Sequence, residues 1–264
     1  MRKEVVELVE VIAAATARRK GSPPDMESRP GAAVPSGMVS PAQAVRRLAG
    51  LIDHTLLRPE ATRAQVEQLC GEARRFGCAT ACVSPSWVSF TGERLRGSPV
   101  KVATVVGFPF GATLTVAKRA EAEVAILAGA QEIDMVMNIG AMKSGDLDRV
   151  ESDIRGVVEV CHQAGVLLKV ILENAYLSDE EKVAACRIAQ RAGADYVKTS
   201  TGLAPAGATE GDVRLMRQTV GPAMGVKAAG GIRTLADALR FLEAGADRLG
   251  TSAAKVILEE AARL

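Results

Sequence analysis

The sequence predicts an α/β fold, a single (β/α)8 TIM barrel with an N-terminal helical extension. The chain has 264 residues, and one such barrel typically takes about 250. Short apolar runs alternate with amphipathic segments long enough for helices, as in α/β proteins with parallel strands. A doubly wound sheet would show the same alternation, but a succession of eight runs matches the eight strands of the closed barrel.

The first 40 residues differ in character from the rest. Residues 1–20 predict one amphipathic helix, whose apolar stripe contains Val5, Leu8, Val9 and Ile12. Residues 21–40 are rich in Gly, Pro and Ser and predict a linker. Because Ser-Pro at 40–41 is a helix-start signal, we expect the barrel domain to cover residues 41–264. The helix has three possible roles at this point: it docks on the barrel, joins two copies, or frays.

Eight apolar runs mark the expected strands. They cover residues 51–55, 79–84, 100–106, 132–138, 167–172, 196–200, 225–228 and 248–251. An Ala-Gly-Ala triplet precedes three of them, with its glycine at Gly129, Gly193 or Gly245. A helix that ends on a left-handed glycine and leads directly into a buried strand gives this pattern. The intervening segments include expected helices at 115–128, 146–163 and 178–191.

The composition limits the classes of binding partner and the cellular compartment that we expect. A net charge of +2 with 3% aromatic residues argues against a nucleic-acid surface, and no run approaches the roughly 20 apolar residues of a membrane span. Acidic residues near the start are unlike a signal peptide. Five cysteines without a C-x-x-C pair indicate a reducing compartment, so we expect a cytoplasmic protein. Two distant histidines give no zinc spacing, so we expect neither metal nor cofactor.

Four charged residues lie inside expected strands with apolar neighbours on both sides: Asp134, Lys169, Lys198 and Lys227. A buried charge is costly unless it is paired, so four such groups in one barrel would compensate one another. Lys198 and Lys227 fall on consecutive runs and would be neighbours. Two close ammonium groups repel, so one loses its proton more easily and becomes an amine nucleophile for carbonyl chemistry. The plainer interpretation is that each lysine only neutralises an interior carboxylate such as Asp134 or Glu173.

Glycine-rich segments after the last three strands predict a phosphate site. Its expected members are Gly202, Gly230, Gly231 and Ser252. Loops after strands seven and eight, together with a helix N-terminus, bind phosphate in barrels of this kind. Asp53 and Cys82 are expected at the ends of the first two strands. Cys82 is interpreted as part of the pocket wall, because no basic residue lies near it in sequence to activate the thiol.

Eight motifs resemble the deoxyribose-phosphate aldolase family and occur in the order of the expected strands. They are LIDHTLL (51–57), ACVSP (81–85), VVGFPFGA (105–112), EIDMVMNIGAMKSGD (132–146), LKVILEN (168–174), DYVKTSTG (195–202), VKAAGGIRT (226–234) and GTSAA (250–254). The resemblance covers about residues 42 to 254 and leaves the first 40 residues outside it.

The resemblance implies reversible cleavage of 2-deoxy-D-ribose 5-phosphate to acetaldehyde and D-glyceraldehyde 3-phosphate, without a cofactor. It implies that Lys198 forms a Schiff base, that Lys227 lowers the pKa of Lys198 and relays protons, and that Asp134 moves protons through a water. The same four residues would hold the phosphate, and Asp53 and Lys169 would complete the charge network. The partners expected are phosphosugar and aldehyde substrates and a second copy in a homo-oligomer, first of all a dimer.

Three positions depart from the family pattern. Ala253 stands where many members have a second serine, Asn174 stands where a threonine is common, and VKAAGG replaces VKASGG or VKPAGG. None of them changes the three residues expected to be catalytic. Two other hypotheses stay open: another phosphosugar-binding barrel enzyme, and a catalytically silent barrel that binds a phosphosugar.

Overall fold

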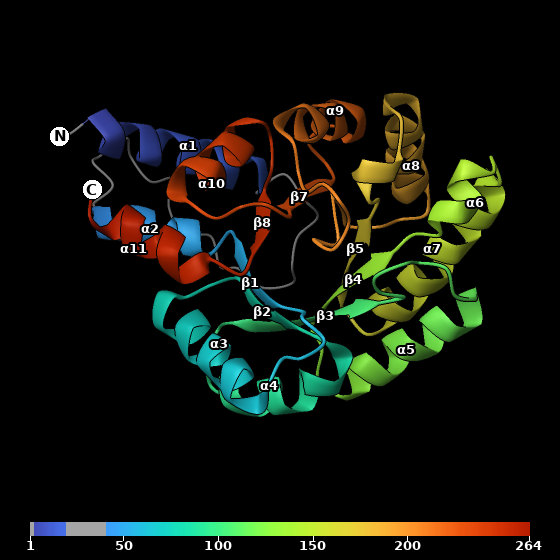
Figure 1. Ribbon diagram of the computed structural model, residues 1–264, viewed down its shortest axis with the longest axis horizontal. Coiled ribbons are helices and arrows are strands. Elements are labelled where there is room, and N and C mark those ends of the chain that lie inside the picture. Colours follow the sequence, from blue (N-terminus) through green and yellow to red (C-terminus); the bar gives the residue numbers. More distant parts are fainter. Residues whose placement is uncertain (1–2, 20–40) are drawn as a thin grey trace.

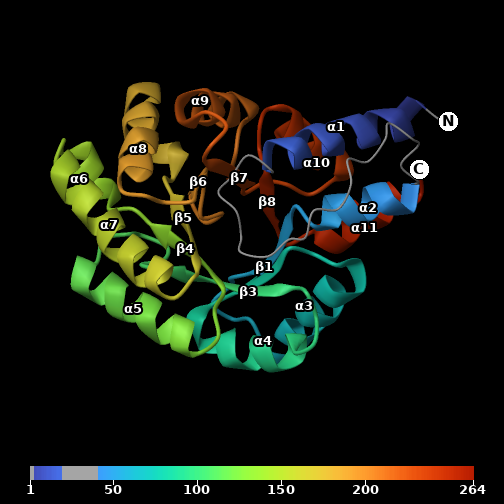
Figure 2. The same ribbon diagram turned by 180° about the vertical axis from the view of Figure 1, so that it is seen from behind.

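The strands close into a barrel, which confirms the predicted fold class (Figures 1 and 2). The computed structural model describes residues 3–19 and 41–264. Its strands are parallel, pair in sequence order, and close by the pairing of the first with the last. They are β1 (Ile52–Leu56), β2 (Thr80–Val83), β3 (Lys101–Val106), β4 (Glu132–Val136), β5 (Leu167–Ile171), β6 (Tyr196–Lys198), β7 (Gly225–Ala229) and β8 (Arg248–Thr251).

Helices connect the strands and surround the barrel (Figure 1). They are α3 (Arg63–Phe76), α4 (Val88–Leu95), α5 (Thr115–Leu127), α6 (Ile139–Lys143), α7 (Leu147–Gln163), α8 (Asp179–Arg191), α9 (Glu210–Val220), α10 (Leu235–Glu243) and α11 (Ala254–Ala262), with 3-10 turns η1 (Pro85–Trp87) and η2 (Asn174–Tyr176). Helix α6 was not expected. The Asn138 side chain accepts the Ala141 N–H at 3.0 Å and caps this helix. The fourth strand therefore ends at Val136 and not at residue 138.

Local sequence signals explain the helix boundaries. Reciprocal capping boxes at Thr62, Ser178 and Thr234 begin α3, α8 and α10. The glycines of the Ala-Gly-Ala triplets have φ of 109°, 88° and 115°, the left-handed region expected after a helix. The chain can therefore turn from each of these helices directly into the next strand.

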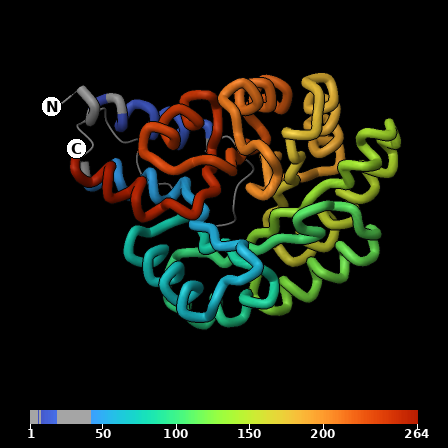
Figure 3. The backbone as a smooth tube through the Cα atoms, in the orientation of Figure 1, coloured from blue at the N-terminus to red at the C-terminus, as the bar shows by residue number. Residues whose placement is uncertain are grey.

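The N-terminal helix α1 (Lys3–Arg19) lies against α10 and α2 (Pro41–Ala49), and α2 lies against α11 (Figures 1 and 3). Leu8 and Ile12 of the expected apolar stripe are buried in this contact. The Arg18 guanidinium donates to the carbonyls of Leu242 at 2.7 Å and Ala246 at 3.3 Å. Helix α1 thus docks on the barrel, while the linker expected at 21–40 lies outside the described residues. No described helix is long and apolar enough to cross a membrane.

The strands have an apolar outer face, and several of them carry charged side chains on the inner face. Successive side chains of a strand point to opposite faces, and β4 shows the result. Its Ile133 and Met135 belong to the apolar core, whereas Glu132 and Asp134 are buried together with charged residues of other strands. The apolar core therefore lies between strands and helices, and the barrel interior holds the charged side chains together with apolar ones such as Val136.

Candidate active site

Seven charged side chains meet inside the barrel, each at most 2% exposed. They are Asp53, Glu132, Asp134, Lys169, Lys198, Lys227 and Arg248. We call this set the charge cluster. Three carboxylates face four cations, so the cluster has one surplus positive charge if every group is ionised.

Asp134 joins the three lysines of the charge cluster. Its Oδ2 accepts from Lys198 Nζ at 2.8 Å and from Lys227 Nζ at 2.7 Å, and its Oδ1 accepts from Lys169 Nζ at 3.1 Å. Lys198 and Lys227 are register partners on β6 and β7. The expectation that these two lysines are neighbours is confirmed.

The remaining carboxylates hold the deeper part of the charge cluster. Lys227 Nζ lies 2.5 Å from Asp53 Oδ2, and Lys169 Nζ lies 2.6 Å from Glu132 Oε2. Arg248 spans both carboxylates, at 2.9 Å from Asp53 and 3.0 Å from Glu132. Asp53 was expected at the end of the first strand, but it is the second residue of β1, where the Thr80 hydroxyl also donates to it at 2.8 Å. This depth gives Asp53 a place beneath Lys227.

The pKa values of the two neighbouring lysines are shifted in opposite directions. Burial lowers the pKa of Lys198; the Asp134 carboxylate opposes this shift and the Lys227 charge adds to it. Burial also acts to lower the pKa of Lys227, but Asp134 and Asp53 together raise it above its ordinary value. Lys227 has two carboxylates and Lys198 has one. Lys198 is therefore the member of the pair that more readily becomes a neutral amine.

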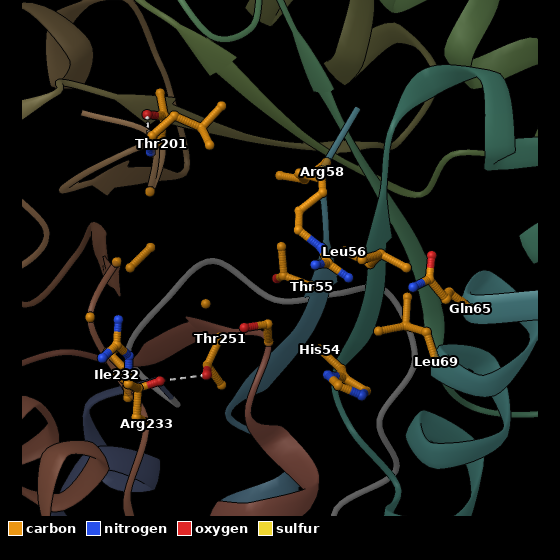
Figure 4. Close-up of a pocket in the computed structure, with 18 of the residues that line it drawn as sticks. His54, Thr55, Leu56, Arg58, Gln65, Leu69, Thr201, Ile232, Arg233 and Thr251 are labelled. Atoms are coloured by element: carbon orange, nitrogen blue, oxygen red, sulfur yellow. Dashed lines mark hydrogen bonds between the residues drawn. The ribbon is translucent and has the colours of Figure 1, made fainter. Parts of the chain in front are cut away.

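A pocket of about 600 Å³ opens above the charge cluster. Lys198 is the member of the cluster that lines this pocket, together with Gly202, Gly230, Gly231 and Ser252. Figure 4 shows another part of its wall, where Thr55 and Thr251 come from the neighbouring strands β1 and β8 and Arg58 and Arg233 lie on two sides of the space. The structure therefore places the expected nucleophile and the four expected phosphate-binding residues around one space.

The glycines of the pocket have conformations that other residues rarely adopt. Gly202, Gly230 and Gly231 have φ of 90°, 88° and 84°. A Cβ on Gly230 would also lie 2.9 Å from Gly207 Cα, so two loops approach closely here. Ser252 stands two residues before Ala254, where α11 starts. Backbone N–H groups at such loops and at a helix N-terminus suit a phosphate.

Cys82 does not line the pocket, contrary to the interpretation of it as pocket wall. It is fully buried on β2, in register with Thr55, which does line the pocket. Burial raises the pKa of the Cys82 thiol to about 11, so it is a thiol and not a thiolate at neutral pH.

Glu173 does not pair with a lysine, so the plainer interpretation fails for this residue. Its carboxylate accepts both the backbone N–H and the hydroxyl of Thr201. Glu173 has φ of 56°, the one positive value of a non-glycine residue in the described ranges. It therefore fixes the loop that carries Gly202.

Sequence reasoning missed two members of the charge cluster, Glu132 and Arg248. Both had a signal: Glu132 stands two residues before Asp134, and Arg248 two residues before Gly250, so each shares a strand face with a residue already considered. Within the part of the chain that the structure describes, no three His, Cys, Asp or Glu side chains are grouped so as to hold a metal ion.

The fold and the site together define a class: a (β/α)8 barrel enzyme with a lysine–carboxylate centre beneath a glycine-lined pocket. The chain belongs to the DeoC/LacD aldolase family, whose family model matches residues 47–258. The chain is therefore an aldolase, which is a kind of lyase.

Relatives and solved structures agree with this membership. A deoxyribose-phosphate aldolase of Streptococcus pneumoniae serotype 19F (strain G54) is 59% identical over 208 residues, which are 79% of this chain and 94% of that protein. A putative deoxyribose-phosphate aldolase from Coccidioides immitis is 38% identical, with a TM-score of 0.80 over 97% of both chains. The deoxyribose phosphate aldolase from Aeropyrum pernix, which has a unique tetrameric structure, is 33% identical with a TM-score of 0.77, over 95% of this chain and 96% of that one.

Proposed function

We propose that the protein is a deoxyribose-phosphate aldolase that reversibly cleaves 2-deoxy-D-ribose 5-phosphate to acetaldehyde and D-glyceraldehyde 3-phosphate. The observation that carries this proposal is the position of Lys198, which lines the pocket while its Nζ lies 2.8 Å from Asp134. Identity to deoxyribose-phosphate aldolases at up to 59% supports the choice of substrate.

The proposed reaction begins with the neutral Lys198 amine, which attacks the C1 aldehyde of the open-chain sugar. Loss of water gives an iminium that accepts electrons. A base then takes the proton of the C3 hydroxyl, the C2–C3 bond breaks, and D-glyceraldehyde 3-phosphate leaves with its new carbonyl. The remaining enamine takes a proton at its terminal carbon, and water releases acetaldehyde and restores the amine.

Asp134 and Lys227 move protons in this proposal. Asp134 Oδ2 contacts both lysine Nζ atoms, so it can transfer protons at the reacting carbon and oxygen through a water. Lys227 stays charged and keeps the neighbouring Lys198 deprotonated. Lys169 and Asp53 hold these two groups in place, as their ion pairs with Asp134 and Lys227 indicate.

The phosphate of the sugar binds at the glycine-lined wall of the pocket in this proposal. The glycines at 202, 230 and 231 offer backbone N–H groups, and Ser252 adds a hydroxyl close to the start of α11. Ala253 supplies no side-chain hydroxyl, and its backbone N–H donates to the Thr251 hydroxyl at 2.9 Å.

Trapping of the Schiff base tests the proposal directly. Borohydride added with acetaldehyde reduces the iminium and leaves a mass tag, which peptide mass spectrometry locates. We expect the tag on Lys198. A tag on another lysine, or none, would overturn the assignment.

Substrate profiling separates the two other hypotheses. A different phosphosugar enzyme on this barrel would not consume free acetaldehyde as donor. A silent barrel would bind 2-deoxy-D-ribose 5-phosphate without turnover. The buried charge cluster argues against silence, because seven buried ionisable groups are costly to keep without a use.

The proposal includes a homodimer formed through α5. Val116, Val124 and Leu127 are 69%, 65% and 87% exposed on one side of this helix. A second copy is the occupant that fits, because an antiparallel pairing about the helix centre places this stripe against itself.

Sedimentation of the full chain tests the dimer. Leu127→Glu should lower the sedimenting mass to that of one chain, whereas Val256→Glu, at an exposed position on α11, should leave it unchanged. A dimer that survives Leu127→Glu would contradict this interface.

A cytoplasmic location completes the proposal. It is supported by the five cysteines, which are all free and buried.

A further inference from the structure

Arg248 is a permanent cation at the deep end of the charge cluster. Its side chain is fully buried at the start of β8, and its guanidinium spans Asp53 at 2.9 Å and Glu132 at 3.0 Å and 3.1 Å. The Tyr196 ring lies 5.9 Å from it. Arg248 does not line the pocket, so it reaches the substrate only through other residues.

The charge balance of the cluster depends on this arginine. Its three carboxylates are balanced by three cations, Arg248, Lys169 and Lys227, and Lys198 is the fourth. A buried group of charges is most stable near neutrality. Arginine cannot lose its proton in a protein, so the balance is restored when a lysine becomes neutral. Lys198 is the lysine that lines the pocket, where its proton can leave.

We propose that Arg248 is a positioning residue for the reaction: its fixed charge satisfies Asp53 and Glu132, holds Asp53 toward Lys227, and leaves Lys198 as the uncharged amine. This inference rests on the proposed Schiff-base role of Lys198. It gives a function to a residue that never touches the substrate.

The charged and titratable groups around Lys198 and Arg248 come from several strands. Those facing Lys198 are Asp134 from β4, Lys227 from β7, Cys82 from β2 and Glu173 after β5. Those facing Arg248 are Asp53, Glu132, Tyr196 and Lys169. Burial acts to lower the pKa of Arg248, and the two carboxylates raise it above its ordinary range. Its charge is thus constant at every pH of an activity assay.

The experiment is the pH dependence of Schiff-base trapping in the full chain, with acetaldehyde and borohydride as probes. Arg248→Met removes one positive charge, so Lys198 keeps its proton to higher pH. We expect the acidic limb of the trapping rate to move up by about one pH unit. A folded variant whose limb stays at the wild-type position would overturn the proposal.

A charge-restoring variant separates electrostatics from packing. Arg248→Met combined with Glu132→Gln again leaves one surplus cation, so the limb should return toward its wild-type position. A double variant that stays shifted like Arg248→Met would contradict the charge-balance argument. If Arg248→Met does not fold, Glu132→Gln alone decides: it removes a negative charge and should move the limb to lower pH, and an unmoved or raised limb overturns the inference.

Arg217 offers a matched control. It is a half-buried arginine that pairs with Asp247 outside the charge cluster. Arg217→Met should leave the acidic limb unmoved even where it lowers stability. Trapping at high pH distinguishes the two proposals. If the wild type shows no tag on Lys198 at any pH, the proposed function is wrong. If the tag is present but the acidic limb of Arg248→Met is not shifted, only the role of Arg248 is wrong.

Discussion

The molecule buries lysines in two different settings, the charge cluster inside the barrel and a single pair in the helical layer. Lys118 on α5 is 0% exposed, as deeply buried as Lys227. Its Nζ donates to Asp153 at 2.5 Å and to the carbonyl of Val136 at 2.9 Å, and the Thr115 hydroxyl also donates to Asp153. One cation meets one carboxylate here.

The difference shows that burial alone does not make a lysine reactive. Burial lowers the pKa of Lys118, as it does for Lys198, and a carboxylate opposes the shift in both places. Lys118 lines no part of the pocket, and its charge is matched one to one. Lys198 has a second ammonium beside it, a surplus of positive charge around it and an open space above it. These three features together favour a neutral, reactive amine at Lys198.

The largest effect on activity is expected for Lys198→Ala. Loss of the amine should reduce aldol cleavage at least about a thousandfold, while phosphosugar binding stays measurable because the phosphate wall is intact. Stability should not fall, since the change removes the surplus cation. Steady-state kinetics together with calorimetric binding checks this. Retained turnover would show that Lys198 is not the nucleophile.

The reverse pattern is expected for Lys118→Met. Asp153 would be left buried without its cation, which costs about 3–5 kcal/mol of unfolding free energy. The kcat and KM of the folded enzyme should stay near wild type. Urea denaturation checks the loss, and Asp153→Leu in the same chain should recover much of it. A clear fall in kcat without a fall in stability would show that the helical pair also serves catalysis.

Lys227→Leu sharpens the contrast inside the charge cluster. The positive charge of Lys227 lowers the pKa of Lys198, so its removal raises that pKa and leaves more of the amine protonated at neutral pH. We expect kcat at neutral pH to fall on the order of a hundredfold, with the acidic limb of the pH–rate profile displaced to higher pH. Full activity at neutral pH would show that Lys198 needs no neighbouring cation.

The smallest effect is expected at the phosphate wall. Ser252→Ala removes one hydrogen bond to a charged group, so KM for the phosphorylated sugar should rise about tenfold. KM for unphosphorylated 2-deoxyribose should not change. Ala253→Ser adds a hydroxyl beside the same helix start and should lower KM for the phosphorylated sugar. Equal effects on both sugars would place the phosphate elsewhere.

Much of the site was predictable because strand position carries information. Asp134, Lys169, Lys198 and Lys227 stand out as charges within apolar runs, and consecutive strands of a parallel barrel are neighbours. Lys118 carries no such signal, because a lysine on an amphipathic helix is usually solvated. Its burial became apparent only when α5 packed beside α7.

Sequence by itself determined the (β/α)8 order, several of the helix ends and the identity of four charges that face inward, because these follow from local periodicity and from glycine and capping chemistry. Those four are Asp134, Lys169, Lys198 and Lys227. Tertiary structure alone decided which charged residues pair with one another. Arg248 meets Asp53 across 195 residues, and Lys198 meets Asp134 across 64. The same holds for the docking of α1 on α10, which had three possible roles from its sequence. Such pairings depend on barrel closure and strand register, since side chains distant in sequence share an electrostatic environment only once the barrel has closed.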